Sequence, residues 1–197
     1  LDIRFQLPSC VPATPFEHAG AVLDAAALEP YWDRKRVLGL GEVMNIPGVL
    51  GHDPDLAAKL LHAQKRRRPI DGHAPGILHE ARSATAAAGI TTDHECSTLE
   101  EMRESLARGM KVIIREGSAA KNLRTLIQDV TPRNSRRCMF CSDDVNPADV
   151  ERLGHMEKHL RMAVEAGVDP MTAVQMATLN AAEHFGLPGG AIAPGKP

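Results

Sequence analysis

The segment KVIIREGS, residues 111–118, contains both features that decide the fold of this chain. Residues 111–114 read as a short, β-branched strand, and Arg115, Glu116 and Ser118 place charged and hydroxyl groups directly after it. A short apolar run that ends in polar residues and leads into a helix-like stretch is typical of a β/α unit in a parallel sheet. The segment therefore predicts one such unit.

The same pattern recurs along the chain, with apolar runs alternating with helix-like stretches. Thr98 and Glu101 form a predicted capping box at the start of one helix, and Asn146-Pro147 and Asp169-Pro170 are predicted starts of two others. We expect strands at residues 3–11, 37–41, 69–72, 89–92, 111–114 and 137–142, and helices at 55–67, 78–88, 97–108, 119–127, 147–166 and 170–186.

The polar residues at the strand ends distinguish a barrel from an open sheet. The last five predicted strands end near residues 42, 73, 94, 116 and 143, and each end carries groups suited to chemistry. In a (β/α) barrel these ends meet at one mouth, whereas in an open sheet they would be spread along an edge. Because no GxGxxG or GxxxxGK[ST] loop follows a strand, a nucleotide-binding doubly wound sheet is disfavoured. We predict an α/β fold of the (β/α)8 TIM-barrel type.

A complete barrel has eight strands in about 250 residues, and this chain has six predicted strands in 197 residues. We therefore expect an internal piece of a longer protein that covers about strands 3 to 8. Residues 1–187 would form the partial barrel domain. Residues 188–197 would begin a linker to a C-terminal β domain.

Four residues at these strand ends could hold a divalent metal. Glu42, His73, His94 and Asp143 are the carboxylates and imidazoles that Zn, Mn or Fe accepts. Taken singly, the two acids could be loop caps and the two histidines buried hydrogen-bonding groups. Because all four fall on successive strand ends, we predict that together they bind metal.

Three other motifs favour structural roles. Cys138 and Cys141 form a CxxC, but residues three apart on a strand point to opposite faces, so we expect buried thiols. His155 and His159 lack the HExxH order, and we expect both on a solvated helix face. The basic run 65–68 ends a predicted helix, where cations complement the helix dipole, so solvent exposure is expected.

Composition argues against several classes of partner. The chain has 23 basic and 25 acidic residues, a formal charge of −2, and only one Trp, one Tyr and four Phe. This balance disfavours nucleic-acid binding, and the lack of a long apolar run disfavours a membrane span. The four cysteines are sparse and irregular, which together with the lack of a signal-like segment favours a cytoplasmic protein.

Six segments carry a family resemblance: PSCVPATPFE (8–17), GLGEVMNIPGV (39–49), IDGHAPG (70–76), GITTDHE (89–95), IREGSAAKNL (114–123) and FCSDD (140–144). In this order they closely resemble the bacterial-type adenine deaminases of the amidohydrolase superfamily. The resemblance implies a deformed (β/α)8 barrel with a two-metal centre, Mn or Fe with Zn as an alternative, that converts adenine and water to hypoxanthine and ammonia. The His-x-His motif that this family carries on its first strand does not occur in these residues.

The resemblance also implies roles for particular residues. Glu42 would bridge two metals, and His73 and His94 would each bind one. Asp143 would be a ligand and a catalytic group that moves a proton from the attacking water to the departing amine.

Further residues on the same rim are weaker candidates. Glu95 is a second candidate catalytic group, and Glu116 and Ser118 are candidate substrate-binding groups. Two alternatives stay open: a related amidohydrolase that acts on a cyclic amide or another heterocycle, and a non-catalytic fragment. The expected partner is a small molecule, and we expect a homo-oligomer at full length.

Overall fold

Short parallel strands alternate with helices in the computed structural model, which describes residues 2–14 and 16–196. The chain divides into two units, one ending at Asp93 and the other beginning at His94. Each unit is described by itself. A strand overlaps each of the six predicted ranges. The first strand, Phe5–Leu7, is shorter than expected, the second, Val37–Val43, is longer, and the fourth, Thr92–Asp93, shares only Thr92 with the predicted range 89–92.

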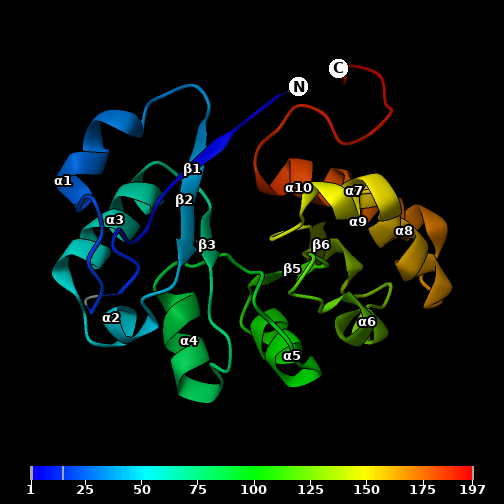
Figure 1. Cartoon of the computed structure of the whole chain (residues 1–197), viewed down its shortest axis with the longest axis horizontal. Helices are drawn as coiled ribbons and strands as arrows, with labels where there is room; N and C mark the ends of the chain where they lie inside the picture. The colour runs from blue at the N-terminus through cyan, green and yellow to red at the C-terminus, as the bar shows by residue number, and fades with distance from the viewer. Residues whose placement is uncertain (1, 15, 197) are drawn as a thin grey trace. The chain divides into compact units, whose positions relative to one another are not determined.

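The first unit is built on a parallel sheet in the order β1-β2-β3 (Figure 1). Leu7 of β1 is paired with Leu40 of β2, and Leu40 with Ile70 of β3. Thr91 then donates its backbone N–H to the Ile70 carbonyl, just before β4 begins. The strands are β1 (Phe5–Leu7), β2 (Val37–Val43), β3 (Ile70–Gly72) and β4 (Thr92–Asp93).

The helices of the first unit begin at side chains that satisfy free backbone N–H groups. Asp53 accepts the N–H of Leu56 at 2.8 Å, and Pro54 occupies the first turn of α3. The buried face of α3 carries Leu56, Leu60 and Ala63. The helices are α1 (Ala25–Leu28), α2 (Ile46–Leu50), α3 (Pro54–Lys65) and α4 (His79–Ala87), with a 3-10 turn at Glu29–Tyr31.

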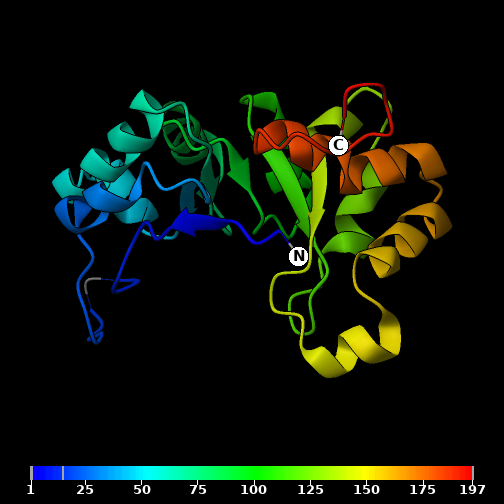
Figure 2. The same cartoon turned by 90° about the horizontal axis from the view of Figure 1, so that it is seen from above.

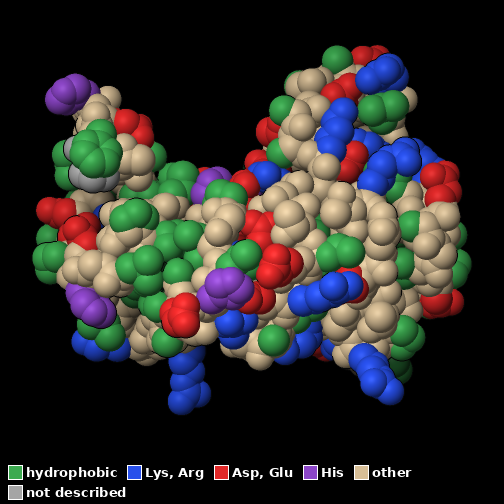
Figure 3. All heavy atoms as spheres, turned by 90° about the horizontal axis from the view of Figure 1, so that it is seen from below, with side chains coloured by type: hydrophobic (Ala, Val, Ile, Leu, Met, Phe, Trp, Pro, Cys, Tyr) green, Lys and Arg blue, Asp and Glu red, His purple; other side chains and the backbone are tan. Residues whose placement is uncertain are grey.

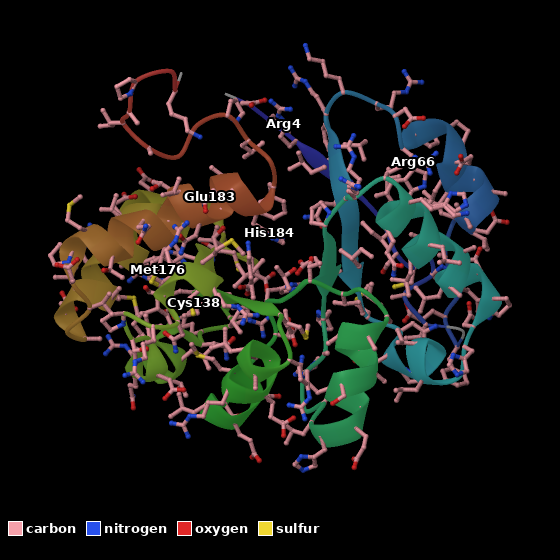
Figure 4. The ribbon with its side chains drawn as sticks, turned by 180° about the vertical axis from the view of Figure 1, so that it is seen from behind. Arg4, Arg66, Cys138, Met176, Glu183 and His184 are labelled. Atoms are coloured by element: carbon pink, nitrogen blue, oxygen red, sulfur yellow. The ribbon has the colours of Figure 1, made fainter. Side chains whose placement is uncertain are left out.

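The second unit is built around two parallel strands, β5 (Lys111–Arg115) and β6 (Cys138–Cys141) (Figure 2). Their pairing runs without a bulge from Val112–Cys138 to Arg115–Cys141. Because strand side chains alternate, one face presents apolar residues to the helices and the other face presents Arg115. The helix-side core includes Val112, Ile114, Cys138, Phe140, Leu123, Leu126, Ala163, Ala173 and Met176. Figure 4 labels Cys138 and Met176 inside it.

The helices of the second unit confirm the predicted starts. Thr98 and Glu101 form the capping box, and Asn146 and Asp169 cap their helices with Pro in the first turn. The helices are α5 (Leu99–Ala107), α6 (Leu123–Leu126), α7 (Pro147–Leu153), α8 (Met156–Glu165), α9 (Pro170–Ala177) and α10 (Leu179–His184), with 3-10 turns at Ile127–Asp129 and Ser135–Arg137.

Two helices that were expected to be continuous are each broken in two. The predicted helix 147–166 stops at Gly154, whose φ of 85° lies in the left-handed region that glycine tolerates. The predicted helix 170–186 is interrupted at Thr178, which leaves helical geometry with φ −126° and ψ −77°. As a result α7 projects from the rest of its unit in Figure 2.

Basic and acidic side chains are interspersed over the face drawn in Figure 3, in keeping with the small net charge. Among the described residues, the helices are too short or too polar to cross a bilayer.

Candidate metal and catalytic site

Glu42 and His73 form a pair in the first unit. Glu42 is the next-to-last residue of β2, and His73 directly follows β3. Oε2 of Glu42 lies 3.1 Å from Nδ1 of His73, with the side chains 44% and 29% exposed. The neighbouring strand ends hold the pair in place, because the Ser9 hydroxyl bonds to the Glu42 carbonyl and the His73 N–H donates to Val43. A carboxylate and an imidazole in contact are suitable donors for a divalent ion.

One buried arginine, Arg82, holds two segments of the first unit: the residues that follow His73, and Asp93, which precedes His94. Arg82 of α4 is fully buried and donates from Nη1 to the equally buried Asp93 carboxylate. Nη2 and Nε also donate to the carbonyls of Ala74 and Ile77, each at 3.0 Å. Because hydrogen bonds from a charged donor are strong, Arg82 fixes these two segments of the first unit.

The second unit brings together His94, Glu95 and Asp143. One potential ligand atom of each lies within 4.8 Å of the others. His94 and Glu95 directly follow β4, and Asp143 comes two residues after β6. Glu95 is 8% exposed, whereas the Asp143 side chain is 32% exposed. Oxygen and imidazole nitrogen donors again fit a divalent ion.

Arg115 is the residue of this group that sequence reasoning missed. Its guanidinium forms a two-bond ion pair with Glu95, with Nη2 at 2.7 Å from Oε2, and Nη1 also lies 2.7 Å from Oδ2 of Asp143. Burial disfavours its charge, but the bonds to Asp143 and Glu95 outweigh that effect and raise the pKa of Arg115. The sequence does contain a signal for Arg115. Strand side chains alternate, so Arg115 lies on the opposite face from Val112 and Ile114.

The adjacent residues Asp143 and Asp144 contact different partners. Asp143, with φ 53°, reaches Arg115. Asp144 instead accepts the backbone N–H groups of Ala119 at 2.7 Å and Ala120 at 3.3 Å. The bond from Ala119 is the main cause that lowers the pKa of Asp144. The two neighbouring carboxylates therefore bind different groups, a side chain in one case and the backbone of a loop in the other.

Glu116 and Ser118 lie among structural contacts. Glu116 is 5% exposed, and its Oε1 is 3.6 Å from the Lys158 ammonium of α8. The Ser118 hydroxyl donates to Asp149 at 2.7 Å and accepts the Asn146 N–H at 2.9 Å, which connects the loop after β5 to the start of α7. Their substrate-binding roles stay predictions.

Two of the remaining motifs differ from expectation. His159 is only 1% exposed, so the prediction of a solvated position is wrong for this residue, although His155 is exposed. Its Nε2 lies 2.9 Å from the Cys141 carbonyl and its ring packs against Phe140, because α8 covers the strands with this face.

In the basic run, Arg66 is not simply solvated. Its Nη2 bonds to Glu29 at 2.9 Å, and its guanidinium lies 5.8 Å from the centroid of the Trp32 ring. Its chain position at the end of α3 is as predicted.

The expectation of buried thiols for the CxxC is confirmed for Cys138 and is wrong for Cys141. Cys138 is buried in the helix-side core, and Cys141, three residues on, lies in the partly exposed end of the strand. Burial raises the pKa of the Cys138 thiol to about 12.

Comparison with known proteins agrees with the predicted resemblance. The amidohydrolase family model matches residues 1–197. The chain is 58% identical over its whole length to an adenine deaminase of Nitratidesulfovibrio vulgaris (strain DP4), and 56% identical over 99% of its length to adenine deaminase 2 of Desulfotalea psychrophila. An adenine deaminase of Clostridium acetobutylicum is 50% identical over 98% of the chain. In each case the chain spans about a third (34%) of the relative's length.

A solved structure shows the same fold. The crystal structure of enamidase, described as a new member of the amidohydrolase superfamily, matches with a TM-score of 0.51 and 20% sequence identity. The match covers 72% of this chain and 40% of the enamidase chain. This likeness and the parallel β/α units confirm the predicted α/β class with a partial TIM barrel. On the family match over its full length, this chain belongs to the amidohydrolase family.

Proposed function

We propose that this chain is the catalytic segment of a longer enzyme that hydrolyses adenine to hypoxanthine and ammonia. The relatives named adenine deaminase, 47% to 58% identical over nearly the whole chain, support this substrate. One structural observation carries the chemistry: Glu42, His73, His94 and Asp143 each lie at or just after the C-terminal end of a parallel β/α strand. In TIM-barrel enzymes that end of the strands carries the active site.

We assign Glu42, His73, His94 and Asp143 as the protein ligands of divalent metal in this enzyme. The fit rests on the donor set, since the Glu42–His73 pair and the His94, Glu95 and Asp143 group both offer oxygen and imidazole nitrogen atoms. We propose two ions, Mn or Fe with Zn as an alternative. When bound, they would act as Lewis acids that make water acidic enough to attack at neutral pH.

Asp143 is the proposed proton-transfer group. Its Oδ2 accepts from Arg115, so we assign Oδ1 as the atom that takes a proton from the attacking water. The same carboxyl would give that proton to the amino group at C6 of the purine, which must leave as neutral ammonia. Glu95 stands next to this carboxylate in the group. Glu116 and Ser118 remain proposed contacts to the base.

We also propose a homo-oligomeric, cytoplasmic enzyme with no nucleic-acid or membrane partner. The small net charge supports the lack of nucleic-acid and membrane partners, and the sparse cysteines support the cytoplasmic location.

The test uses the full-length enzyme, meaning this chain together with its flanking segments. The purified protein is loaded with Mn²⁺, Fe²⁺ or Zn²⁺, and ammonia and hypoxanthine are measured with adenine, with a cyclic amide as the comparison substrate. We expect stoichiometric ammonia and hypoxanthine from adenine. Turnover of the cyclic amide alone, or no turnover with metal bound, would contradict the proposal.

A further inference from the structure

We propose that Arg115 is a positioning residue of this site: it holds the carboxylates of Glu95 and Asp143 side by side, and Glu95 acts through Arg115 rather than on the substrate. The inference deepens the proposed function and rests on it.

The contacts of Arg115 use three nitrogen atoms of the guanidinium. Nη1 and Nη2 bind the two oxygens of Glu95, Nη1 also binds Oδ2 of Asp143, and Nε donates to Oδ1 of Asn122 at 2.7 Å. Asn122 is itself fixed, since its backbone N–H donates to the Arg115 carbonyl at 3.1 Å. With 13% of its side chain exposed, Arg115 is enclosed by these partners.

Only an arginine can make this set of contacts. Its planar fork offers parallel N–H groups that match a carboxylate, and further N–H groups remain for other acceptors. A lysine at residue 115 would place a single ammonium there and could not bind both oxygens of Glu95 together with Asp143 and Asn122.

The backbone at Asp143 explains why a clamp is needed. With φ 53° this residue occupies the left-handed region, which a non-glycine residue adopts at a cost and keeps only when its surroundings hold it. The bond from Arg115 fixes the side chain of Asp143, while Cys141, two residues earlier, is held through its carbonyl by Glu116 N–H. Reacting groups that shift by about 1 Å can lose about a hundredfold in rate.

The pairing also bears on Glu95. Both of its oxygens accept from Arg115, which is the geometry of a carboxylate that orients a cation. A proton donor to the substrate would need one of these oxygens for its own proton. We therefore assign Glu95 to the support of Arg115.

The test compares Arg115→Ala and Arg115→Lys with the wild type in the full-length enzyme. We expect kcat for adenine to fall by about a hundredfold in both variants, with a smaller change in KM. Added guanidinium ion at low millimolar concentration should restore part of kcat in Arg115→Ala only, because it can occupy the vacated position. Arg103→Ala is the matched control, since Arg103 forms a similar two-bond pair with Asp129 on the exposed surface.

A second readout is independent of turnover. The affinity for Mn²⁺, measured by competition with a chelator, should fall by about tenfold or more in Arg115→Ala and stay unchanged in Arg103→Ala, as expected when a partner of a metal ligand is lost. Full kcat in Arg115→Lys, or unchanged Mn²⁺ affinity in Arg115→Ala, would overturn the inference. Failure of the proposed function looks different: the wild type would then bind Mn²⁺ without deaminating adenine.

Discussion

Replacing Arg82 with methionine should destabilise the first unit severely. The change removes the Arg82 ion pair with the buried Asp93 carboxylate, and it removes the donors to the carbonyls of Ala74 and Ile77. Removing one partner of a buried ion pair costs about 3–5 kcal/mol. With a urea m-value of about 1–3 kcal/mol/M, the midpoint of unfolding should fall by about 1 M or more.

The assay is urea unfolding followed by the fluorescence of Trp32, the single tryptophan, which is fully buried in the same unit. The matched control is Arg4→Met, because Arg4 pairs with Asp2 at the exposed surface and its loss should not move the midpoint measurably. Adding Asp93→Leu to Arg82→Met should recover part of the stability, since the buried carboxylate that Arg82 had paired with is then gone. A midpoint for Arg82→Met within about 0.3 M of wild type would refute the reasoning.

The remaining predictions concern the site, the isolated chain and one thiol. In the full-length enzyme Glu42→Gln should lower metal content, and lower deamination by at least about a hundredfold; full activity with two metals retained would remove Glu42 from the site. Asp143→Asn should abolish turnover while Asp144→Asn keeps a substantial part of it, which a reversed order of kcat would contradict. Residues 1–197 alone should bind metal weakly and release no ammonia from adenine, and sustained turnover would disprove this. Because the pKa of Cys138 is raised from 9.0 to about 12, the stability it contributes is complete below pH 9. Between pH 9 and pH 12 this contribution to the free energy of unfolding should fall by no more than about 1.4 kcal/mol per pH unit. Urea unfolding midpoints measured over this range should fall less in Cys138→Ala than in the wild type.

The sequence predicted the features that depend on local periodicity. The positions of the strands and the capping box at Thr98 follow from alternation and capping rules. For the same reason the candidate ligands could be picked out as polar residues at strand ends. These rules need only a few neighbouring residues, so they can be applied without knowing the fold.

The parts that could not be predicted depend on partners distant in the chain. Arg115 looked like one more polar residue until the parallel strands brought Glu95 and Asp143 to it, 20 residues before and 28 residues after it. The sequence pattern predicts a surface position for His159, because its partner, the Cys141 carbonyl, is a backbone atom that no sequence pattern marks. The break at Gly154 was missed because a single glycine within a helix-like pattern does not by itself predict a helix end.

The adjacent carboxylates after β6 should respond differently to selection. Asp144 accepts the backbone N–H groups of Ala119 and Ala120 and so stabilises the fold of that loop, whereas Asp143 lies in the left-handed region and is the proposed proton-transfer group. A library selected only for soluble, folded protein should therefore retain Asp144 and let Asp143 drift toward asparagine or glycine, which tolerate that backbone better. A library selected for growth on adenine as nitrogen source should keep both. Comparing the two libraries would separate, at neighbouring positions, the residues kept for folding from those kept for chemistry.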